Sequence, residues 1–162
     1  SATFPSSPSS TPSYNSCANF MLTATMGLNG FIAMGVEEDW ATHMIGHELT
    51  ALCGLDHGET LAIVHPALMD VMREEKKGKL LQYAKRVWGI NLENENKAID
   101  LAIEKTENFF RSIGKKTRLS ENNIGDDVIE EIVKRFTDRG WCVGERGIVT
   151  PEKTRQILQR AK

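Results

Sequence analysis

The sequence predicts an all-α fold, and three observations lead to that prediction. Apolar residues recur at the three- and four-residue spacing of a helix face in most segments between Cys17 and the C-terminus. No stretch alternates apolar and polar residues for long, as a half-buried strand would. No segment has the strand–helix–strand pattern of a parallel sheet, and nothing repeats at a fixed period. We therefore expect about six or seven helices.

The first two predicted helices lie near the N-terminus. One spans residues 19–34, where apolar residues have helical spacing and Gly35 is a plausible stop. The other opens with the acidic triplet at residues 37–39, because the helix dipole favours carboxylates at a helix N-terminus. It continues towards Leu52 and ends near Gly54.

The remaining helices follow with short connections. Asp56 belongs to a residue type that favours the N-cap, so a third helix is predicted to begin directly after it and to continue to Met72. Thr150 can cap the last helix, in which Pro151 takes the first helical position. Helical spacing of apolar residues predicts the helices after the third, which span residues 76–88, 95–113, 128–136 and 151–161.

Two regions differ in composition. Residues 1–16 are rich in Ser, Pro and Thr and carry no charge, so they bury too little surface to offset the entropy of ordering. We expect them to be a disordered tail, a linker or an expression remnant. Residues 17–162 are expected to form one helical domain.

Composition excludes several classes of function. A formal net charge of -2 and a pI near 6.1 give no basic surface for nucleic acid or anionic lipid. Three cysteines without CxxC spacing favour a reducing, cytoplasmic location over a disulfide framework, and no apolar run approaches the ~20 residues of a membrane span. Neither GxGxxG nor GxxxxGK[ST] occurs, so no residue of this chain is predicted to bind a nucleotide cofactor.

All four histidines fall within 23 consecutive residues, at His43, His47, His57 and His65. Imidazole is the commonest protein ligand for ions such as Fe²⁺ and Zn²⁺. His43 and His47 are four residues apart and share a helix face, although such a pair also occurs by chance. An unbroken helix from His43 to Cys53 rises ~15 Å. We therefore expect the chain to turn back soon after His47 if His57 is to reach the same ion. His65 is expected to be structural.

A protease motif is the competing interpretation of this segment. His47-Glu48 followed by Gly54 and His57 is similar to the HExxHxxGxxH motif of zinc proteases. The middle ligand position is occupied by Ala51, which cannot bind a metal ion. A hydrolase is therefore disfavoured.

The segment from Leu28 to Met69 resembles the C-terminal domain of the iron-containing (group III) alcohol dehydrogenases. The match is HxxxHxxxxxxxxxHG followed by an apolar run and a proline, here His43, His47, His57, Gly58 and Pro66. The segments DWATHM, GHELTA, GLDH and LLQYAKRVWGI are similar to the branch of NADPH-dependent butanol dehydrogenases and aldehyde reductases. The resemblance covers about residues 18–162 and leaves out the first sixteen.

The resemblance implies a metal-dependent oxidoreductase of primary alcohols and aldehydes. It implies that His43 and His57 are two of the ligands of one Fe²⁺ or Zn²⁺ ion, and that His47 is a catalytic residue near the nicotinamide of NADP or NAD. The implied partners are an N-terminal nucleotide-binding domain, a small alcohol or aldehyde, and a second copy in a homodimer.

The sequence also departs from the family pattern. The family's other two ligands come from an Asp-xxx-His motif on an upstream helix, and no histidine precedes His43 here. We expect half a metal site, no cofactor site, and a fragment that is inactive alone. The alternative is a helical oligomerisation or interaction domain without catalysis.

Overall fold

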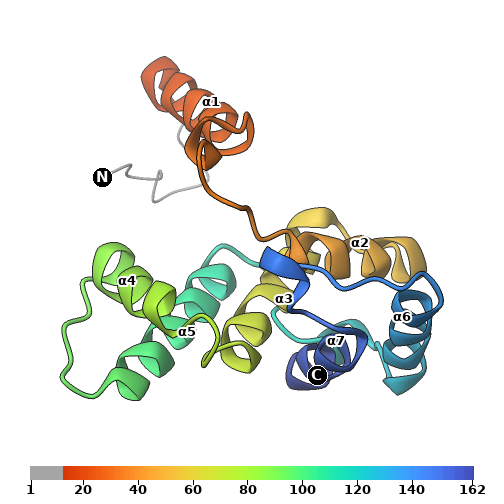
Figure 1. Cartoon of the computed structure of the whole chain (residues 1–162). Coiled ribbons are helices and arrows are strands. Elements are labelled where there is room, and N and C mark those ends of the chain that lie inside the picture. Colours follow the sequence, from red (N-terminus) through yellow and green to blue (C-terminus); the bar gives the residue numbers. More distant parts are fainter. Residues whose placement is uncertain (1–12) are drawn as a thin grey trace. The chain divides into compact units, whose positions relative to one another are not determined.

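Helices occupy most of residues 13–162, the part of the chain that the computed structural model describes (Figure 1). This part holds seven α-helices, three 3-10 turns and no strand, and Val143 and Val149 form an isolated antiparallel bridge. The predicted all-α fold is confirmed. The tail prediction for residues 1–12 lies outside the described residues.

Residues up to Glu38 form a unit of their own, separate from residues 39–162. In it, α1 (Tyr14–Leu28) precedes the 3-10 turn η1 (Phe31–Ala33). The helix begins five residues before the predicted start, because Ser13 Oγ accepts the backbone N–H of Ser16 at 3.2 Å and caps it. The last residues of the segment predicted to be a tail are thus helical.

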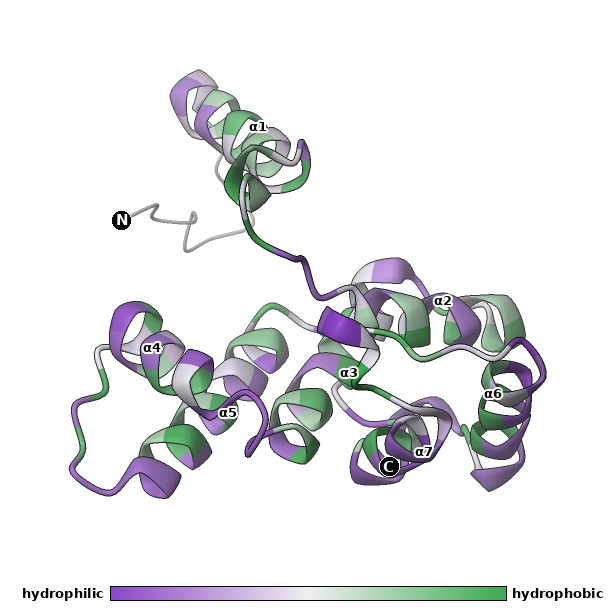
Figure 2. Cartoon of the chain, in the orientation of Figure 1, coloured by the Kyte–Doolittle hydropathy of each residue, from purple (hydrophilic) through white to green (hydrophobic). Residues whose placement is uncertain are grey.

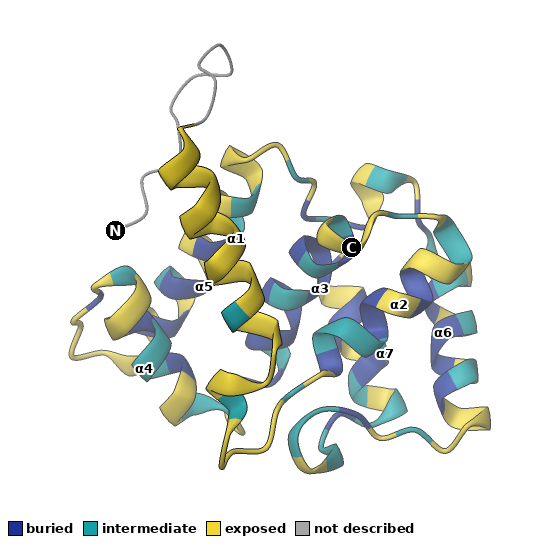
Figure 3. Ribbon diagram, turned by 90° about the horizontal axis from the view of Figure 1, so that it is seen from above, coloured by how far each residue is buried: buried dark blue, intermediate teal, exposed yellow. Residues whose placement is uncertain are grey.

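Every residue of α1 is at least partly exposed, and yellow dominates the helix in Figure 3. Its sequence has no charged residue. None of the helices in residues 13–162 combines the length and hydropathy that crossing a membrane requires. Helix α1 therefore presents an uncharged, largely apolar surface. Large apolar side chains are exposed in residues 13–38 at Tyr14, Phe20, Met21, Leu22, Leu28, Phe31, Ile32, Met34 and Val36.

Helix α2 (Ala41–Cys53) begins after the acidic triplet and not with it. The prediction was wrong there because Asp39 caps from outside the helix. Its Oδ1 accepts the N–H of Ala41 at 2.9 Å, and its Oδ2 lies 2.5 Å from Lys76 Nζ. Gly54 ends the helix with φ +68°, a conformation that favours glycine.

The other helices match the predicted segments to within about two residues. Asn94 caps α5 and Thr150 caps α7 by accepting the N–H groups of Lys97 and Lys153, and Pro151 stands at the first position of α7 as predicted. These helices are α3 (His57–Val71), α4 (Lys77–Trp88), α5 (Glu95–Ser112), α6 (Asp126–Asp138) and α7 (Pro151–Arg160), with 3-10 turns η2 (Ser120–Asn122) and η3 (Glu145–Gly147).

Helix α3 is the centre of the unit formed by residues 39–162. It contacts α2, α5 and α7, while α4 packs on α5 and α6 packs on α7 (Figure 1). Purple and green residues both occur along α6 and α7, as expected for helices with one buried face (Figure 2). The main core lies between α2, α3, α6 and α7 around the fully buried Phe136, and Met69 of α3 joins a smaller core with α4 and α5.

Candidate functional site

Three of the four histidines lie close together. The ring centroids of His43 and His57 are 5.2 Å apart, those of His47 and His57 5.6 Å, and those of His43 and His47 6.4 Å. His47 and His57 are exposed and His43 is half-buried, so the cluster lies at the surface. The three histidines singled out in the sequence therefore form one cluster.

The expectation that the chain turns back soon after His47 was wrong. Helix α2 continues unbroken to Cys53, and His57 still reaches His43. After Gly54 the chain runs back along α2 in a short connection, and the first turn of α3 packs directly on Gly46 of α2. A Cβ at Gly46 would lie 2.8 Å from Thr60 Oγ1, and this close crossing places His57 beside the helix face that carries His43.

We predict that Gly46→Ala lowers the free energy of unfolding by about 1–3 kcal/mol, because the added methyl group overpacks the crossing. Thr60 is fully buried and its hydroxyl donates to the carbonyl of His57 at 2.8 Å, so rotating it away breaks a hydrogen bond. Urea unfolding of the purified chain measures the effect.

Gly78→Ala is the matched control, since Gly78 is also helical and a Cβ there meets no atom within 4 Å. It should be neutral or slightly stabilising. Equal stability of the two variants would contradict the close crossing.

The spacing of the rings bears on metal binding. Two imidazoles that bind one ion through nitrogens at about 2 Å in tetrahedral geometry have centroids about 5 Å apart. The His43–His57 separation fits that value, and His47 is farther from His43. Within residues 13–162 no three His, Cys, Asp or Glu side chains form a group that could hold an ion. The imidazoles of His43 and His57 therefore fit two positions of a metal site, and the described residues do not supply a third.

His43 has the surroundings of a neutral imidazole. Burial lowers its pKa below the usual value, and the charges of His57 and His47 act in the same direction. The neutral form is the one that binds metal ions. The indole of Trp40 meets the ring edge-on at a centroid distance of 4.8 Å and covers one side of it.

His65 stands apart from these three rings. Its Nδ1 lies 3.5 Å from Thr42 Oγ1, at the limit of a hydrogen bond. Burial lowers the pKa of His65, while the carboxylate of Asp39 opposes the shift. This connection between α2 and α3 agrees with the structural interpretation.

Glu48 is engaged in ion pairs. Only 7% of the residue is exposed, and its carboxylate accepts from Arg139 at 2.5 Å and from Arg135 at 3.0 Å. Burial raises its pKa, but these two arginines outweigh burial and hold the pKa below the usual value. The ion pairs of this carboxylate join α2 to α6. A carboxylate held by two arginines is a poor general base, which further disfavours the protease interpretation.

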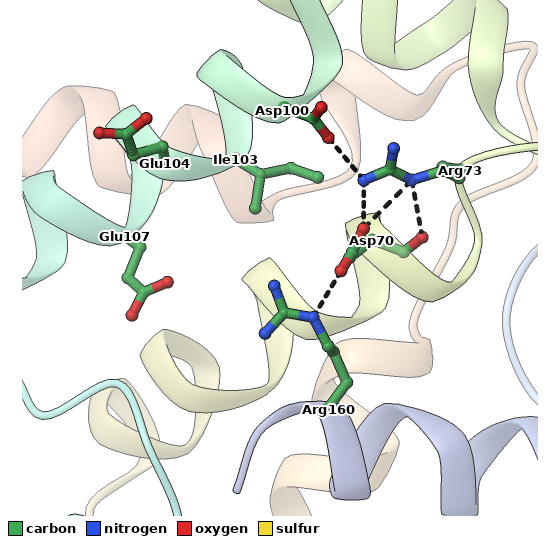
Figure 4. Close-up of a pocket in the computed structure, with 7 residues that line it drawn as sticks. All are labelled: Asp70, Arg73, Asp100, Ile103, Glu104, Glu107 and Arg160. Atoms are coloured by element: carbon green, nitrogen blue, oxygen red, sulfur yellow. Dashed lines mark hydrogen bonds and ion pairs between the residues drawn. The ribbon is translucent and has the colours of Figure 1, made fainter. Parts of the chain in front are cut away.

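A shallow pocket of about 400 Å³ lies among α3, α5 and α7 (Figure 4). Asp70 at its edge pairs with Arg73 and Arg160, and Arg73 also reaches Asp100 at 2.8 Å. These ion pairs join three helices. The lining residues are Asp70, Arg73, Asp100, Ile103, Glu104, Glu107 and Arg160.

Sequence reasoning missed Trp40, which contacts His43, and a contact between Lys115 and the first turn of α3. Trp40 could have been found from its place three residues before His43 on the expected helix. Lys115 follows α5, and its Cε lies 4.0 Å from where a Cβ of Gly58 would stand. No local pattern in the sequence indicates that second contact.

Comparison with known proteins identifies the family. Residues 5–161 match the model of the Fe-containing alcohol dehydrogenase family, C-terminal. The match begins within the segment that we expected to fall outside the resemblance.

The chain is also similar to individual enzymes. The chain is 46% identical to the NADPH-dependent aldehyde reductase YqhD of Escherichia coli, over 92% of this chain and 39% of the relative. It is 30% identical to NADH-dependent butanol dehydrogenase A of Clostridium acetobutylicum, over 93% of this chain and 40% of that enzyme. The chain thus spans about two fifths of the length of these relatives.

Solved structures show the same fold. The crystal structure of YqhD from Escherichia coli K-12 superposes with a TM-score of 0.88, covering 92% of this chain and 38% of that one. NADH-dependent butanol dehydrogenase A of Thermotoga maritima gives a TM-score of 0.81 at 32% identity, covering 91% of this chain and 39% of that one. The chain belongs to the Fe-containing alcohol dehydrogenase family, whose C-terminal part it matches.

Proposed function

We propose that this chain is the metal-binding part of an NAD(P)H-dependent alcohol dehydrogenase or aldehyde reductase acting on small primary alcohols and aldehydes. The 5.2 Å separation of the His43 and His57 rings carries the proposal. The names of two relatives, an NADPH-dependent aldehyde reductase and an NADH-dependent butanol dehydrogenase, support it.

In this proposal His43 and His57 hold one Fe²⁺ or Zn²⁺ ion, whose other ligands come from outside residues 13–162. Such an ion, when bound, acts as a Lewis acid on the substrate oxygen. His47 is exposed at the edge of the cluster, 5.6 Å from His57 between centroids. Histidine side chains commonly serve as general acids and bases in enzymes, so we assign His47 to proton transfer or orientation of the substrate.

The nucleotide is proposed to bind mainly to an N-terminal domain that works in the cytoplasm with this chain. Two facts support that division: the chain spans 39% of the aldehyde reductase, and its sequence has no glycine-rich phosphate loop. The uncharged, exposed surface of α1 supports association with that domain and with a second copy as a homodimer. The same surface favours the second candidate, a non-catalytic interaction domain.

Titration with Co²⁺, followed by its visible absorption, separates the two candidates. The metal-binding proposal predicts one Co²⁺ per chain, bound weakly because two imidazoles replace a site with three or four protein ligands. The double variant His43→Ala/His57→Ala should lose the absorption. His47→Ala, which leaves that pair intact, is the control and should keep it. A wild-type chain without a Co²⁺ spectrum would favour the interaction domain.

A further inference from the structure

Asn29 and Gly30 form the only Asn-Gly pair in the sequence. Both residues are exposed, between the end of α1 and the 3-10 turn η1. The backbone nitrogen that follows an asparagine can attack the side-chain carbonyl carbon and close a five-membered succinimide ring. A glycine in that position favours the reaction, because it has no Cβ to hinder the approach and its backbone rotates easily. The pair is therefore a chemically labile point of the chain.

The surroundings of Asn29 permit the ring to close. Closure requires its ψ, which is 7°, to rotate until the Gly30 nitrogen lies beside the side-chain carbonyl carbon. A Cβ at Gly30 would meet no atom of residues 13–162 within 4 Å, and neither α1 nor η1 contains a buried residue. Two hydrogen bonds hold the carboxamide: Oδ1 accepts the N–H of Phe31 at 3.0 Å, and Nδ2 donates to Met26 Sδ at 3.5 Å. Thioether sulfur is a weak acceptor, so the departing nitrogen is held weakly.

Asn123 is the comparison within the chain. It is also exposed and lies outside the α-helices, directly after the 3-10 turn η2. The next residue is Ile124, which is buried in the main core and branched at Cβ. Rotating the backbone at Asn123 would pull this side chain out of the core, and its branched Cβ hinders attack by its nitrogen. Exposure is thus common to both asparagines, and the following residue separates them.

We propose that Asn29 is a modification site at which the chain deamidates without an enzyme, with water as the co-reactant. The Gly30 nitrogen forms a bond to Asn29 Cγ, the bond between Cγ and Nδ2 breaks, and the Gly30 proton leaves with Nδ2 as ammonia. Water then opens the ring at either of its two carbonyl carbons. One opening gives aspartate, and the other gives isoaspartate, in which the main chain passes through the former side chain.

The product introduces a charge where the sequence has none. Residues 1–36 contain no Asp, Glu, Lys, Arg or His. The new carboxylate stands at the C-terminal end of α1, where the helix dipole is also negative, so it destabilises the last turn. Isoaspartate also adds one carbon to the main chain between α1 and η1. The apolar surface of α1 thereby gains a negative charge at one end.

Incubation of the purified full chain at physiological temperature, followed by intact-mass measurement, tests the proposal. We expect the mass to rise by about 1 Da per chain, because an NH₂ group is replaced by OH. The rise should be faster at mildly alkaline than at mildly acidic pH, since base removes the proton from the attacking nitrogen. Peptide mass spectrometry should locate the change at residue 29, in two forms that chromatography separates as aspartate and isoaspartate.

Asn29→Gln is the matched variant, because it keeps an exposed primary amide but would have to close a six-membered ring. It should slow the gain in mass by at least about tenfold. Asn123→Gln is the control and should gain mass as fast as the wild-type chain. The proposal is overturned if the wild-type mass stays constant over several weeks, if Asn29→Gln gains mass as fast as the wild type, or if the modified residue is Asn123 or another asparagine.

Discussion

Purified residues 1–162 are expected to oxidise no NADPH in the presence of butanal. Hydride transfer requires the nicotinamide to be held at near-attack distance from a polarised carbonyl, and positioning of this kind is worth about 7–11 kcal/mol of a barrier. The chain supplies two imidazoles of the proposed metal site, and its sequence has no glycine-rich turn for the pyrophosphate. The loss should therefore be complete within the detection limit of an absorbance assay at 340 nm.

Activity should appear when this chain is combined with the part of a relative that it does not match. A chimaera in which residues 13–162 replace the matched part of the Escherichia coli aldehyde reductase tests this, and 46% identity favours correct packing. We expect NADPH-dependent turnover of butanal by the chimaera, and some turnover when the two parts are mixed as separate chains. NADPH oxidation at an enzymatic rate by the 162-residue chain alone would contradict the proposal, because the cofactor would then have to bind among these helices.

In the same chimaera, the three histidines should separate by role. His43→Ala and His57→Ala each remove a proposed ligand, so the purified variants should contain little metal and lose activity by more than about a thousandfold. His47→Ala should keep the ion and lower kcat by about 10²–10⁴, as loss of a proton-transfer group does. Elemental analysis of each purified variant, beside its kcat, separates the two effects.

His65 provides the internal comparison. It lies on α3 like His57 but contacts Thr42 instead of the other rings. His65→Gln should therefore keep both metal and turnover, apart from a loss of stability. The opposite pattern, with His47→Ala emptying the site and His57→Ala leaving it full, would reverse the assigned roles.

Most of the fold could be predicted because its signals are local. Helical spacing of apolar residues, the Thr150 cap and Pro151 each act within one or two turns of a helix, so the sequence displays them directly. The histidine pair on α2 is local in the same sense. The start of α2 was missed because Asp39 accepts the N–H of Ala41 from two residues upstream.

The remainder of the site depends on contacts between distant residues. Glu48 meets Arg135 and Arg139 across 87 and 91 positions, and Lys115 meets the first turn of α3 across more than fifty. His57 reaches His43 because Thr60 packs closely on Gly46. The length of α2 considered alone predicted that His57 would lie too far from His43. A single sequence shows which face of a helix is apolar, but it does not show which faces pack against one another.

The position of His57 at the first residue of α3 has a consequence for amide hydrogen exchange. Helix α3 supplies side chains to both cores, so opening it requires the two to separate together. Its central amides should exchange among the slowest in residues 39–162. If His57 binds an ion as proposed, the helix that carries it is already ordered without the ion, so binding should require little ordering of α3.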